Sequence, residues 1–262
     1  MKFKKCFVDA DSIIYKIAYK SSSVREAKKS YEKAIEDIQW DTNSDEVVVA
    51  LRGKGNFRYD IAGDYKGHRA KKPALIDEAL VKRRKAIDKH AYSLGHFKSD
   101  NCEADDVVSI WADEEPDKDS FVIAHIDKDI DMVTGWHYNF GKRTPVYYID
   151  DDEGWLKLCT QMLTGDSTDN IKGIKGVGPK TAEKLLADAH TSEEMLAVVT
   201  KAWKEATDTE DWEYDMETCF NLVYMRRNWD DFRRLTVDEV FNETTVSQSD
   251  EEDHGSNKTK EV

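Results

Sequence analysis

Three acidic side chains fall within four positions in the middle of the 262-residue chain, at Glu103, Asp105 and Asp106. An apolar run at helical spacing follows them and Asn101 precedes them as an expected N-cap, so all three acids belong to the first turn of a helix. The helix dipole favours acids there, but crowded carboxylates also repel and raise one another's pKa unless a cation lies among them. Oxygen ligands at this density suit Mg²⁺ or Mn²⁺. The cluster therefore predicts half of a metal site.

Other acids stand directly after segments that are predicted to be buried strands. Asp9 ends the first apolar segment of the chain, and Asp127 and Asp129 closely follow the apolar segment 120–124. Strands separated by helical patterns pair in parallel through crossovers, and an open α/β sheet places its site at the carboxyl ends of its strands. We therefore expect these strand ends to converge on the helix start at Glu103, although Asp9 or Asp11 could instead only cap the next helix.

A basic strip crosses an otherwise acidic chain. The formal net charge is −14, yet residues 64–90 carry nine Lys or Arg against four Asp or Glu. The distribution of charge matters more than its sum for binding a polyanion. The segment from about 74 to 92 is predicted to be a helix with cations around most of its circumference, which a solvated charged surface would also explain. With Tyr65 beside Lys66, we favour a phosphate-binding element with a stacking aromatic ring.

Glycines form a second distinctive stretch, at Gly173, Gly176 and Gly178, directly before Pro179. Glycine permits a tight turn and close backbone approach, and proline suits the start of a helix whose free N–H groups point at that turn. The pattern predicts a helix–turn–helix whose glycine turn binds a phosphate. Nearby cations and acids favour this interpretation over a plain helical hairpin; they are Lys172, Lys175, Lys180, Asp166 and Asp169.

The remaining elements follow from the periodicity of the apolar residues. Helices are expected over 12–19, 24–38, 154–163, 191–206 and 212–227, strands over 46–51 and 145–149, and a hairpin arm over 57–61. His125 and His137 are expected to be structural residues rather than ligands.

Composition sets further limits. No stretch approaches the roughly 18 apolar residues of a membrane span, and the chain start leads into a strand rather than a signal peptide. The cysteines are scattered without a CxxC pair and suggest neither zinc nor a disulfide framework, so a cytoplasmic protein is expected.

Five motifs occur in an order that resembles the 5′-nuclease family, which comprises flap endonucleases, phage 5′→3′ exonucleases and the 5′-nuclease domain of bacterial DNA polymerase I. They are Phe7-Val8-Asp9, Tyr65-Lys66-Gly67-His68-Arg69, Glu103-Ala104-Asp105-Asp106, Asp127-Lys128-Asp129, and Gly165-Asp166-Ser167-Thr168-Asp169-Asn170 before the glycine turn. The resemblance spans about residues 3 to 190, and the small size is most similar to that of the phage members.

The resemblance implies an α/β fold with a mostly parallel central sheet flanked by helices, of the PIN-like 5′-nuclease type. It also implies a helical arch and a helix-three-turn-helix element that grips duplex DNA. The expected organisation is a nuclease domain over 1–165 that includes the arch at about 64–92, the helix-three-turn-helix and C-terminal helices over 166–241, and an acidic disordered tail over 242–262.

The resemblance also implies the site residues. Lys66 and Arg69 would reach the scissile phosphate, and Tyr65 would stack on an unpaired base. The implied metal ligands are Asp9, Glu103, Asp105, Asp106, Asp127, Asp129, Asp166 and Asp169, with Asp105 or Asp106 shared by the second metal. The implied DNA contacts are Tyr65, Lys71, Lys72, Arg83, Arg84, Lys172, Lys175, Gly176, Gly178 and Lys180.

The implied cofactors are two Mg²⁺ ions, for which Mn²⁺ could substitute, with K⁺ at the glycine turn. Two metals explain the number of carboxylates, since one activates a water and both neutralise the charge of the phosphate in the transition state. The implied partner is DNA with a 5′ end, flap or branch, bound by a monomer in the cytoplasm, or the host cytoplasm for a phage protein. RNA of RNA–DNA hybrids could also be cleaved.

One departure from the family pattern affects the first metal. The family usually carries a further aspartate after the second strand, but Leu51-Arg52-Gly53-Lys54-Gly55-Asn56 contains no acid. Asp60 or Asp64 could replace it, the site could be weakened, or the change could be inactivating.

Two other functions stay open. A PIN-type ribonuclease shares the carboxylate cluster but has no reason to carry the glycine turn. A DNA-binding member of the family with weakened catalysis would keep the basic strip and the turn while lacking a metal ligand, as the sequence after the second strand allows.

Overall fold

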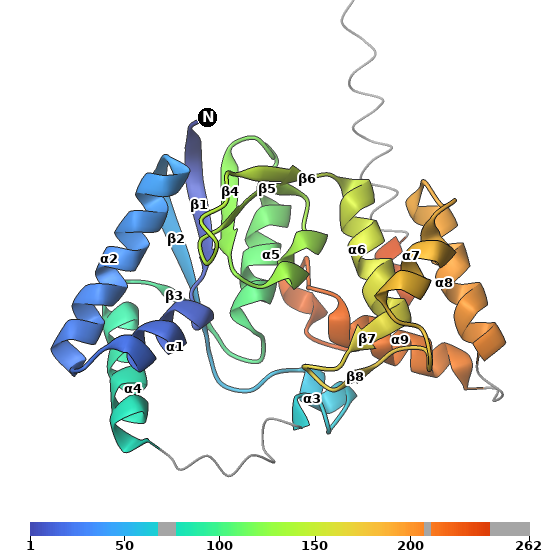
Figure 1. Cartoon of the computed structure of the whole chain (residues 1–262), viewed down its shortest axis with the longest axis horizontal. Coiled ribbons are helices and arrows are strands. Elements are labelled where there is room, and N and C mark those ends of the chain that lie inside the picture. Colours follow the sequence, from blue (N-terminus) through green and yellow to red (C-terminus); the bar gives the residue numbers. More distant parts are fainter. Residues whose placement is uncertain (68–76, 207–210, 242–262) are drawn as a thin grey trace, which may run out of the picture.

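A computed structural model describes residues 1–67, 77–206 and 211–241. Its centre is a six-stranded sheet in the order β3-β2-β1-β4-β5-β6, in which the first five strands are parallel and β6 is antiparallel to β5 (Figure 1). The strands are β1 (Phe3–Asp9), β2 (Ser44–Arg52), β3 (Phe97–Ser99), β4 (Phe121–His125), β5 (Gly135–Asn139) and β6 (Tyr147–Ile149). The expected mostly parallel sheet is confirmed.

The strand order determines which strand ends lie next to one another at the edge of the sheet. From β1 the chain crosses to β2 on one side, and β4 later pairs with β1 on the other side. Asp9 is the partner of Ala50, and Val8 is the partner of Ala124. The carboxyl ends of these three neighbouring strands therefore meet where the strand order reverses, which is the crevice that open α/β sheets use for ligands.

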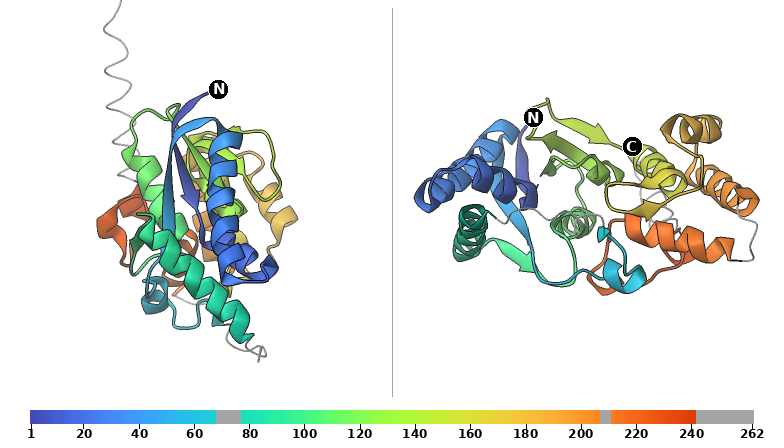
Figure 2. Two further views of the ribbon diagram at one scale, coloured as in Figure 1. Left: turned by 90° about the vertical axis from the view of Figure 1, so that its left-hand side faces the viewer. Right: turned by 60° about the horizontal axis from the view of Figure 1, so that its bottom comes forward.

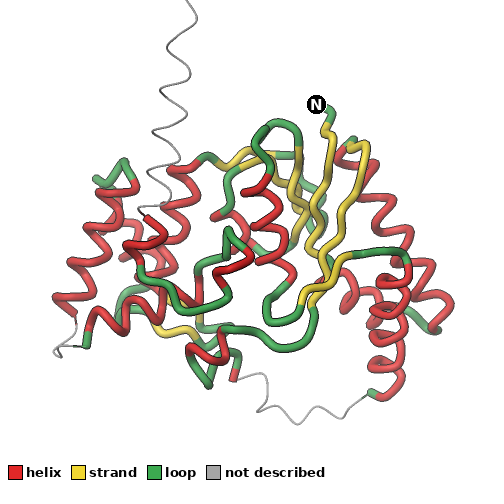
Figure 3. Tube along the Cα trace, turned by 180° about the vertical axis from the view of Figure 1, so that it is seen from behind, coloured by secondary structure: helices red, strands yellow, loops and turns green. Residues whose placement is uncertain are grey.

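Helices cover both faces of the sheet because side chains alternate along its strands. Cys6 and Val8 belong to a core with α1 (Asp11–Lys20), α2 (Val24–Thr42) and α4 (Glu78–Ser93), whereas Phe7 belongs to a core with α5 (Ala104–Glu114). Figures 2 and 3 show these helices on opposite sides of the strands.

The C-terminal helices extend the second core beyond β6. They are α6 (Asp151–Thr164), α7 (Pro179–Leu186), α8 (Ser192–Ala206) and α9 (Trp212–Val223), with the short strands β7 (Gly165–Asp166) and β8 (Ile171–Lys172) between α6 and α7. Figure 1 shows this group beside the sheet, and its apolar side chains are continuous with those around α5. The division of the chain at residue 165 stays a prediction, because one core joins the two parts.

Three local expectations are wrong. The segment expected as a hairpin arm is the short helix α3 (Arg58–Ile61), since Asn56 Oδ1 accepts from the Arg58 N–H at 3.0 Å and the Arg58 side chain turns into the interior. Asn101 does not cap α5; the N-cap is Glu103, whose N–H donates to Asp106 Oδ2 at 3.1 Å. The short strands β3 and β5 were not expected at all. The tail at 242–262 and the arch residues 68–76 lie outside the described residues.

Candidate functional site

A cleft of about 750 Å³ opens at the carboxyl edge of the sheet. The end of β1, the start of α5, the segment after β4 and the turn between β7 and β8 all contribute to it. Every expected metal ligand except Asp106 lines this cleft, and Asp11 and Asp88 join them; the acids are Asp9, Asp11, Asp88, Glu103, Asp105, Asp127, Asp129, Asp166 and Asp169. The structure thus brings together side chains that are up to about 160 positions apart in the sequence.

Burial and mutual repulsion shift the pKa values of Asp9, Asp105 and Asp127 upwards. Burial, followed by the charge of Asp11, raises the pKa of Asp9 to about 7. Burial, followed by the charges of Asp106 and Glu103, raises the pKa of Asp105 well above its usual range. The pKa of Asp127 is raised as well, first by burial of its carboxyl group and then by neighbouring carboxylates. A cluster of this kind is stable in its charged form only with cations among its members.

Lys66 supplies one such cation at the centre of the cluster. Its ammonium group lies 2.6 and 2.8 Å from the two carboxylate oxygens of Glu103 and 3.3 Å from Asp169 Oδ2. The backbone N–H of Lys66 donates to the Asp169 carbonyl at 2.7 Å, and the φ of +54° places this residue in the left-handed region. The backbone bond holds the amine between acids from two separate elements.

Glu103 is the acid with the most partners. Burial alone would raise its pKa, but Lys66 and Arg58 lower the pKa of Glu103 to about 2. Arg52 Nη1 lies 3.8 Å from Glu103 Oε1, and the Tyr65 hydroxyl donates to Glu103 Oε2 at 2.8 Å. The stacking of Tyr65 on a base stays a prediction, because its side chain lines the cleft but is only 4% exposed in this structure.

Asp106 is a structural acid, which corrects its expected role as a metal ligand. The side chain is fully buried, and both carboxylate oxygens accept from the Arg58 guanidinium, at 2.6 and 2.8 Å. Arg58 also donates to the carbonyls of Leu222 and Tyr224, at the end of α9. Asp106 does not line the cleft, whereas its neighbour Asp105 does.

Some of the cations of α4 face the cleft, and one contacts α1 instead. Arg83 Nε donates to the Ala18 carbonyl at 2.7 Å, and its side chain is 13% exposed, so its expected DNA contact stays a prediction. Arg84 and Lys85 instead line the cleft, together with Lys98 from β3. Arg69, Lys71 and Lys72 lie outside the described residues.

The glycine turn precedes α7 as expected. Gly176 has a φ of +86°, which favours glycine, and Gly178 is the N-cap of α7. Gly173 allows close approach, because a Cβ there would lie 2.2 Å from the Thr164 carbonyl carbon. The three nearby lysines, Lys172, Lys175 and Lys180, are exposed. The turn thus combines glycines with exposed lysines directly before the start of α7.

Comparison with known proteins gives the family. Residues 4–142 match the 5′-3′ exonuclease, N-terminal resolvase-like domain, and residues 158–239 match the 5′-3′ exonuclease, C-terminal SAM fold. The chain belongs to the 5′-3′ exonuclease family.

Individual members of this family are distant relatives of the chain. It is 28% identical over 167 residues to the flap endonuclease Xni of Pseudoalteromonas translucida, covering 59% of this chain and 63% of the relative. It is 28% identical over 215 residues to DNA polymerase I of Bacillus subtilis, covering 74% of this chain and 24% of the relative. The chain therefore spans less than two thirds of these curated relatives.

Solved structures share the fold. The 5′-exonuclease of bacteriophage T5 with bound zinc has a TM-score of 0.68 at 19% identity, covering 83% of this chain and 88% of that one. The T5 D15 flap endonuclease in a pseudo-enzyme-product complex with DNA and metal ions has a TM-score of 0.59 at 16% identity, covering 84% of this chain and 98% of that one.

The departure from the family pattern has a structural counterpart. Arg52 and Gly53 line the cleft where the family usually has an aspartate, whereas neither Asp60 nor Asp64 lines it. Asp64 Oδ2 instead accepts from the Asn170 amide at 3.0 Å. Asp11, which sequence reasoning treated only as a possible helix cap, is the additional acid of this region. Its Oδ1 accepts from the Arg52 N–H at 3.0 Å, and this bond is a signal that only the folded chain gives.

No helix is long and apolar enough to cross a membrane among the residues that the structure describes, which are 1–67, 77–206 and 211–241.

Proposed function

We propose that the chain is a divalent-metal-dependent 5′-nuclease that hydrolyses phosphodiesters of DNA near a 5′ end, flap or branch. The observation that carries this proposal is the convergence of the cleft acids on Lys66 at the carboxyl edge of the sheet. The sequence match to 5′-3′ exonuclease domains and the likeness to a relative named as a flap endonuclease support the same activity.

The donor set of the cleft fits hard divalent cations. Its acids offer only carboxylate oxygens, which Mg²⁺ and Mn²⁺ prefer, and the described residues that line the cleft include no histidine or cysteine. Asp9, Glu103 and Asp105 would hold one ion, and the second would be held by Asp127, Asp129, Asp166 and Asp169. Bound ions of this kind lower the pKa of water and neutralise charge on a phosphate. Asp11 would complete the first set in place of the acid that the family carries after β2.

Lys66 has the placement of a transition-state stabiliser. Its side chain is 10% exposed, so its charge acts in a largely dehydrated site. We assign it a hydrogen bond to a non-bridging oxygen of the scissile phosphate. Water oxygen bonds to phosphorus, the bond to the 3′ oxygen breaks, and the leaving oxygen takes up a proton, which yields a 5′-phosphate. Arg69 would assist from the base of the arch.

The DNA itself would be held by two positive surfaces. Arg84, Lys85 and Lys98 line the cleft near the acids and suit the single strand or the cleavage region. The glycine turn with its exposed lysines suits the phosphates of the duplex, and its carbonyls suit K⁺. We propose that the chain acts on DNA as a monomer in the cytoplasm.

A cleavage assay tests the function. The full chain is incubated with a 5′-labelled flap, a blunt duplex and single-stranded RNA, with Mg²⁺, with Mn²⁺ or with EDTA. We expect cleavage of the DNA substrates that requires the metal and leaves 5′-phosphates, and its loss in Asp169→Asn, which excludes a contaminating nuclease. Cleavage of RNA alone would favour a PIN-type ribonuclease.

A DNA-binding protein with weakened catalysis is the second candidate. The guanidinium of Arg52, 3.8 Å from Glu103, favours it because a cation beside a metal ligand opposes the metal. Tight flap binding without cleavage at any Mg²⁺ or Mn²⁺ concentration would identify this function.

A further inference from the structure

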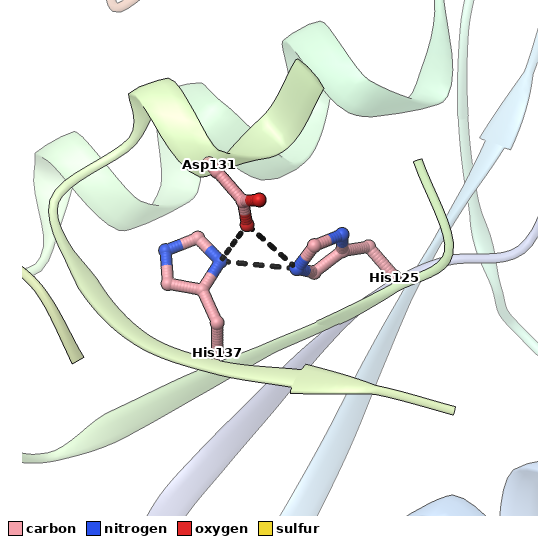
Figure 4. A group of neighbouring side chains, drawn as sticks. All are labelled: His125, Asp131 and His137. Atoms are coloured by element: carbon pink, nitrogen blue, oxygen red, sulfur yellow. Dashed lines mark hydrogen bonds and ion pairs between the residues drawn. The ribbon is translucent and has the colours of Figure 1, made fainter. Parts of the chain in front are cut away.

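A second polar cluster lies outside the nuclease cleft, between the sheet and the segment that follows β4. His125 ends β4, His137 lies in β5, and Asp131 belongs to the short helix η2 (Lys128–Met132) between them. Among the residues that the structure describes, these are the ones that bring three possible ligand atoms within 4.8 Å of one another (Figure 4). Both imidazoles are fully buried, whereas the Asp131 side chain is 29% exposed.

Backbone carbonyls fix the proton on each ring. His125 Nδ1 lies 2.6 Å from the Asp127 carbonyl, and His137 Nε2 lies 2.7 Å from the Val133 carbonyl. A carbonyl can only accept a hydrogen bond, so each of these nitrogens carries a proton. The remaining nitrogen of each neutral ring has a lone pair, and these two nitrogens face one another at 3.1 Å. Two acceptors at this distance require a positive charge between them.

Asp131 and Tyr147 increase that requirement. Asp131 Oδ1 lies 3.7 Å from His125 Nε2 and 4.0 Å from His137 Nδ1. The Tyr147 hydroxyl lies 2.8 Å from Asp131 Oδ1 and 3.3 Å from His125 Nε2, and its single proton satisfies only one of these acceptors. The cluster thus holds more acceptors than donors.

We propose that His125, His137 and Asp131 bind a divalent transition metal of the Zn²⁺ class at a structural site separate from the nuclease cleft. Two ligands about 2.1 Å from a tetrahedral zinc lie about 3.4 Å apart, and the observed separations of 3.1 to 4.0 Å need only small shifts to reach this. The carbonyl behind each imidazole is the partner that metal-bound histidines usually have. Imidazole suits transition metals, whereas Mg²⁺ prefers oxygen.

A shared proton is the competing explanation, and it fits the cluster less well. With one proton between the rings, Asp131 Oδ1 accepts from the Tyr147 hydroxyl alone and lies beyond hydrogen-bond distance of both imidazoles, whereas a metal can coordinate all three ligands. Burial and the neighbouring His125 also lower the pKa of His137 to about 3, which disfavours an imidazolium there.

The site would act on the nuclease cleft through the chain segment it ties down. The metal would join β4 and β5 to η2, and this segment carries Asp127 and Asp129 into the cleft. This consequence rests on the proposed function, but the site itself does not. The metal is therefore a positioning element for two carboxylates, and it takes no part in cleavage.

Zinc coordination is measured directly by X-ray absorption on the full, metal-depleted chain with one equivalent of Zn²⁺ and excess Mg²⁺. We expect the scattering pattern of two imidazole ligands. The described cleft residues include no histidine, so zinc bound to the nuclease acids would give an oxygen shell instead. An all-oxygen shell, or a chain that retains no zinc, would overturn the proposal whatever the cleavage assay shows.

Matched variants complete the test. His137→Gln should lower zinc affinity at least about 100-fold and abolish the rise in thermal midpoint that zinc produces, since a ligand is lost. Asp131→Asn keeps an acceptor for Tyr147 and should weaken zinc binding without unfolding the chain. His190→Gln, at an exposed histidine, should bind zinc like the parent. Equal zinc affinity and an unchanged imidazole pattern in His137→Gln and Asp131→Asn would contradict the assignment.

Discussion

At the scale of single residues, the cleft is organised by cations that neutralise its acids. Lys66 contacts Glu103 and Asp169 at once, while Arg52 approaches Glu103 from the end of β2. Both cations stabilise the ionised form of Glu103, but they differ in position. Lys66 lies in the centre of the acids with little exposure, and Arg52 is 37% exposed at the edge. Their removal should therefore have different effects.

Lys66→Ala should lower turnover about 100- to 1,000-fold, which corresponds to roughly 2.7–4 kcal/mol of lost transition-state stabilisation. DNA affinity should change less than about threefold, since one buried amine contributes little to holding a duplex. Single-turnover cleavage and equilibrium binding of the same flap separate the two effects. Lys172→Ala, at an exposed lysine of the glycine turn, is the control and should weaken binding while turnover at saturation stays unchanged. An effect of Lys66→Ala on affinity alone would make Lys66 an ordinary phosphate contact.

Arg52→Asp should lower the Mg²⁺ concentration for half-maximal cleavage, because it replaces a cation near Glu103 by the acid that the family usually carries. Asp11→Asn should raise the same concentration by about tenfold, since a carboxylate of the cleft is lost. Cleavage rates over a Mg²⁺ titration measure both.

Asp60→Asn is the control for this pair, because Asp60 is exposed and does not line the cleft. Gly53→Asp is not a usable alternative, since a Cβ at Gly53 would lie 2.1 Å from the Ser99 carbonyl oxygen. Unchanged metal dependence in both Arg52→Asp and Asp11→Asn would mean that this end of the cleft holds no metal.

The pKa of Asp9 predicts how metal binding depends on pH. Because the pKa of Asp9 is raised to about 7, the folded, metal-free chain keeps a proton there that the unfolded chain releases at lower pH. The contribution of Asp9 to stability therefore falls as pH rises from its unfolded pKa, about 4, to its folded pKa. A bound metal restores that contribution, because it stabilises the ionised carboxylate in the folded chain. We expect the Mg²⁺-induced rise in thermal midpoint to be larger at about pH 8 than at about pH 6, where the metal must displace the proton.

Asp9→Asn tests the assignment of this pH dependence. The variant should show a smaller metal effect that hardly varies over the same pH range. If it keeps the full pH dependence, the titrating group is another acid of the cleft.

At the scale of elements, the parallel sheet could be predicted because β1, β2 and β4 are apolar and separated by helical patterns. β5 was missed because His137 and Asn139 interrupt its apolar pattern, and their burial depends on contacts with η2 and the segment after β4. A helix beginning close to these acids was predicted, but neither its N-cap nor the acid that faces the cleft was. Adjacent helical residues differ in direction by about 100°, and only the distant Arg58 decides that Asp106 points inward.

The glycine turn is the element whose DNA contact can be tested by one side chain. Gly176→Val places a β-branched residue at a φ of +86°, which costs about 1–2 kcal/mol and distorts the turn. Duplex affinity should fall roughly tenfold at fixed salt, with turnover at saturating DNA little changed. Gly178→Ala is the matched control, since Gly178 has a φ of −102° and open space around it. Equal affinities of the two variants for duplex DNA would exclude a phosphate contact at Gly176.

At the scale of the whole molecule, one buried ion pair joins the nuclease sheet to the C-terminal helices. Arg58 of α3 contacts Asp106 of α5, the carbonyl of Leu222 in α9 and that of Tyr224 directly after it. The Arg226 N–H also lies 3.3 Å from Asp106 Oδ1. The contact spans about 160 positions, so the sequence motif alone could not separate this structural acid from the ligands beside it. It also explains why the two matched family regions behave as one packed body.

Asp106→Ala should destabilise the chain by about 3–5 kcal/mol, because it leaves the Arg58 guanidinium buried without its counter-charge. Urea unfolding followed by tryptophan fluorescence measures the change. The double variant Asp106→Ala with Arg58→Met should recover part of the loss, since it removes the unpaired charge as well. Asp105→Ala is the matched control one position away. It removes a repelled carboxylate from the cleft, so it should leave stability unchanged or slightly higher while cleavage falls. If Asp106→Ala were instead as stable as the parent and lost only metal binding, Asp106 would be a metal ligand, and the α3–α5–α9 junction would be held by apolar packing alone.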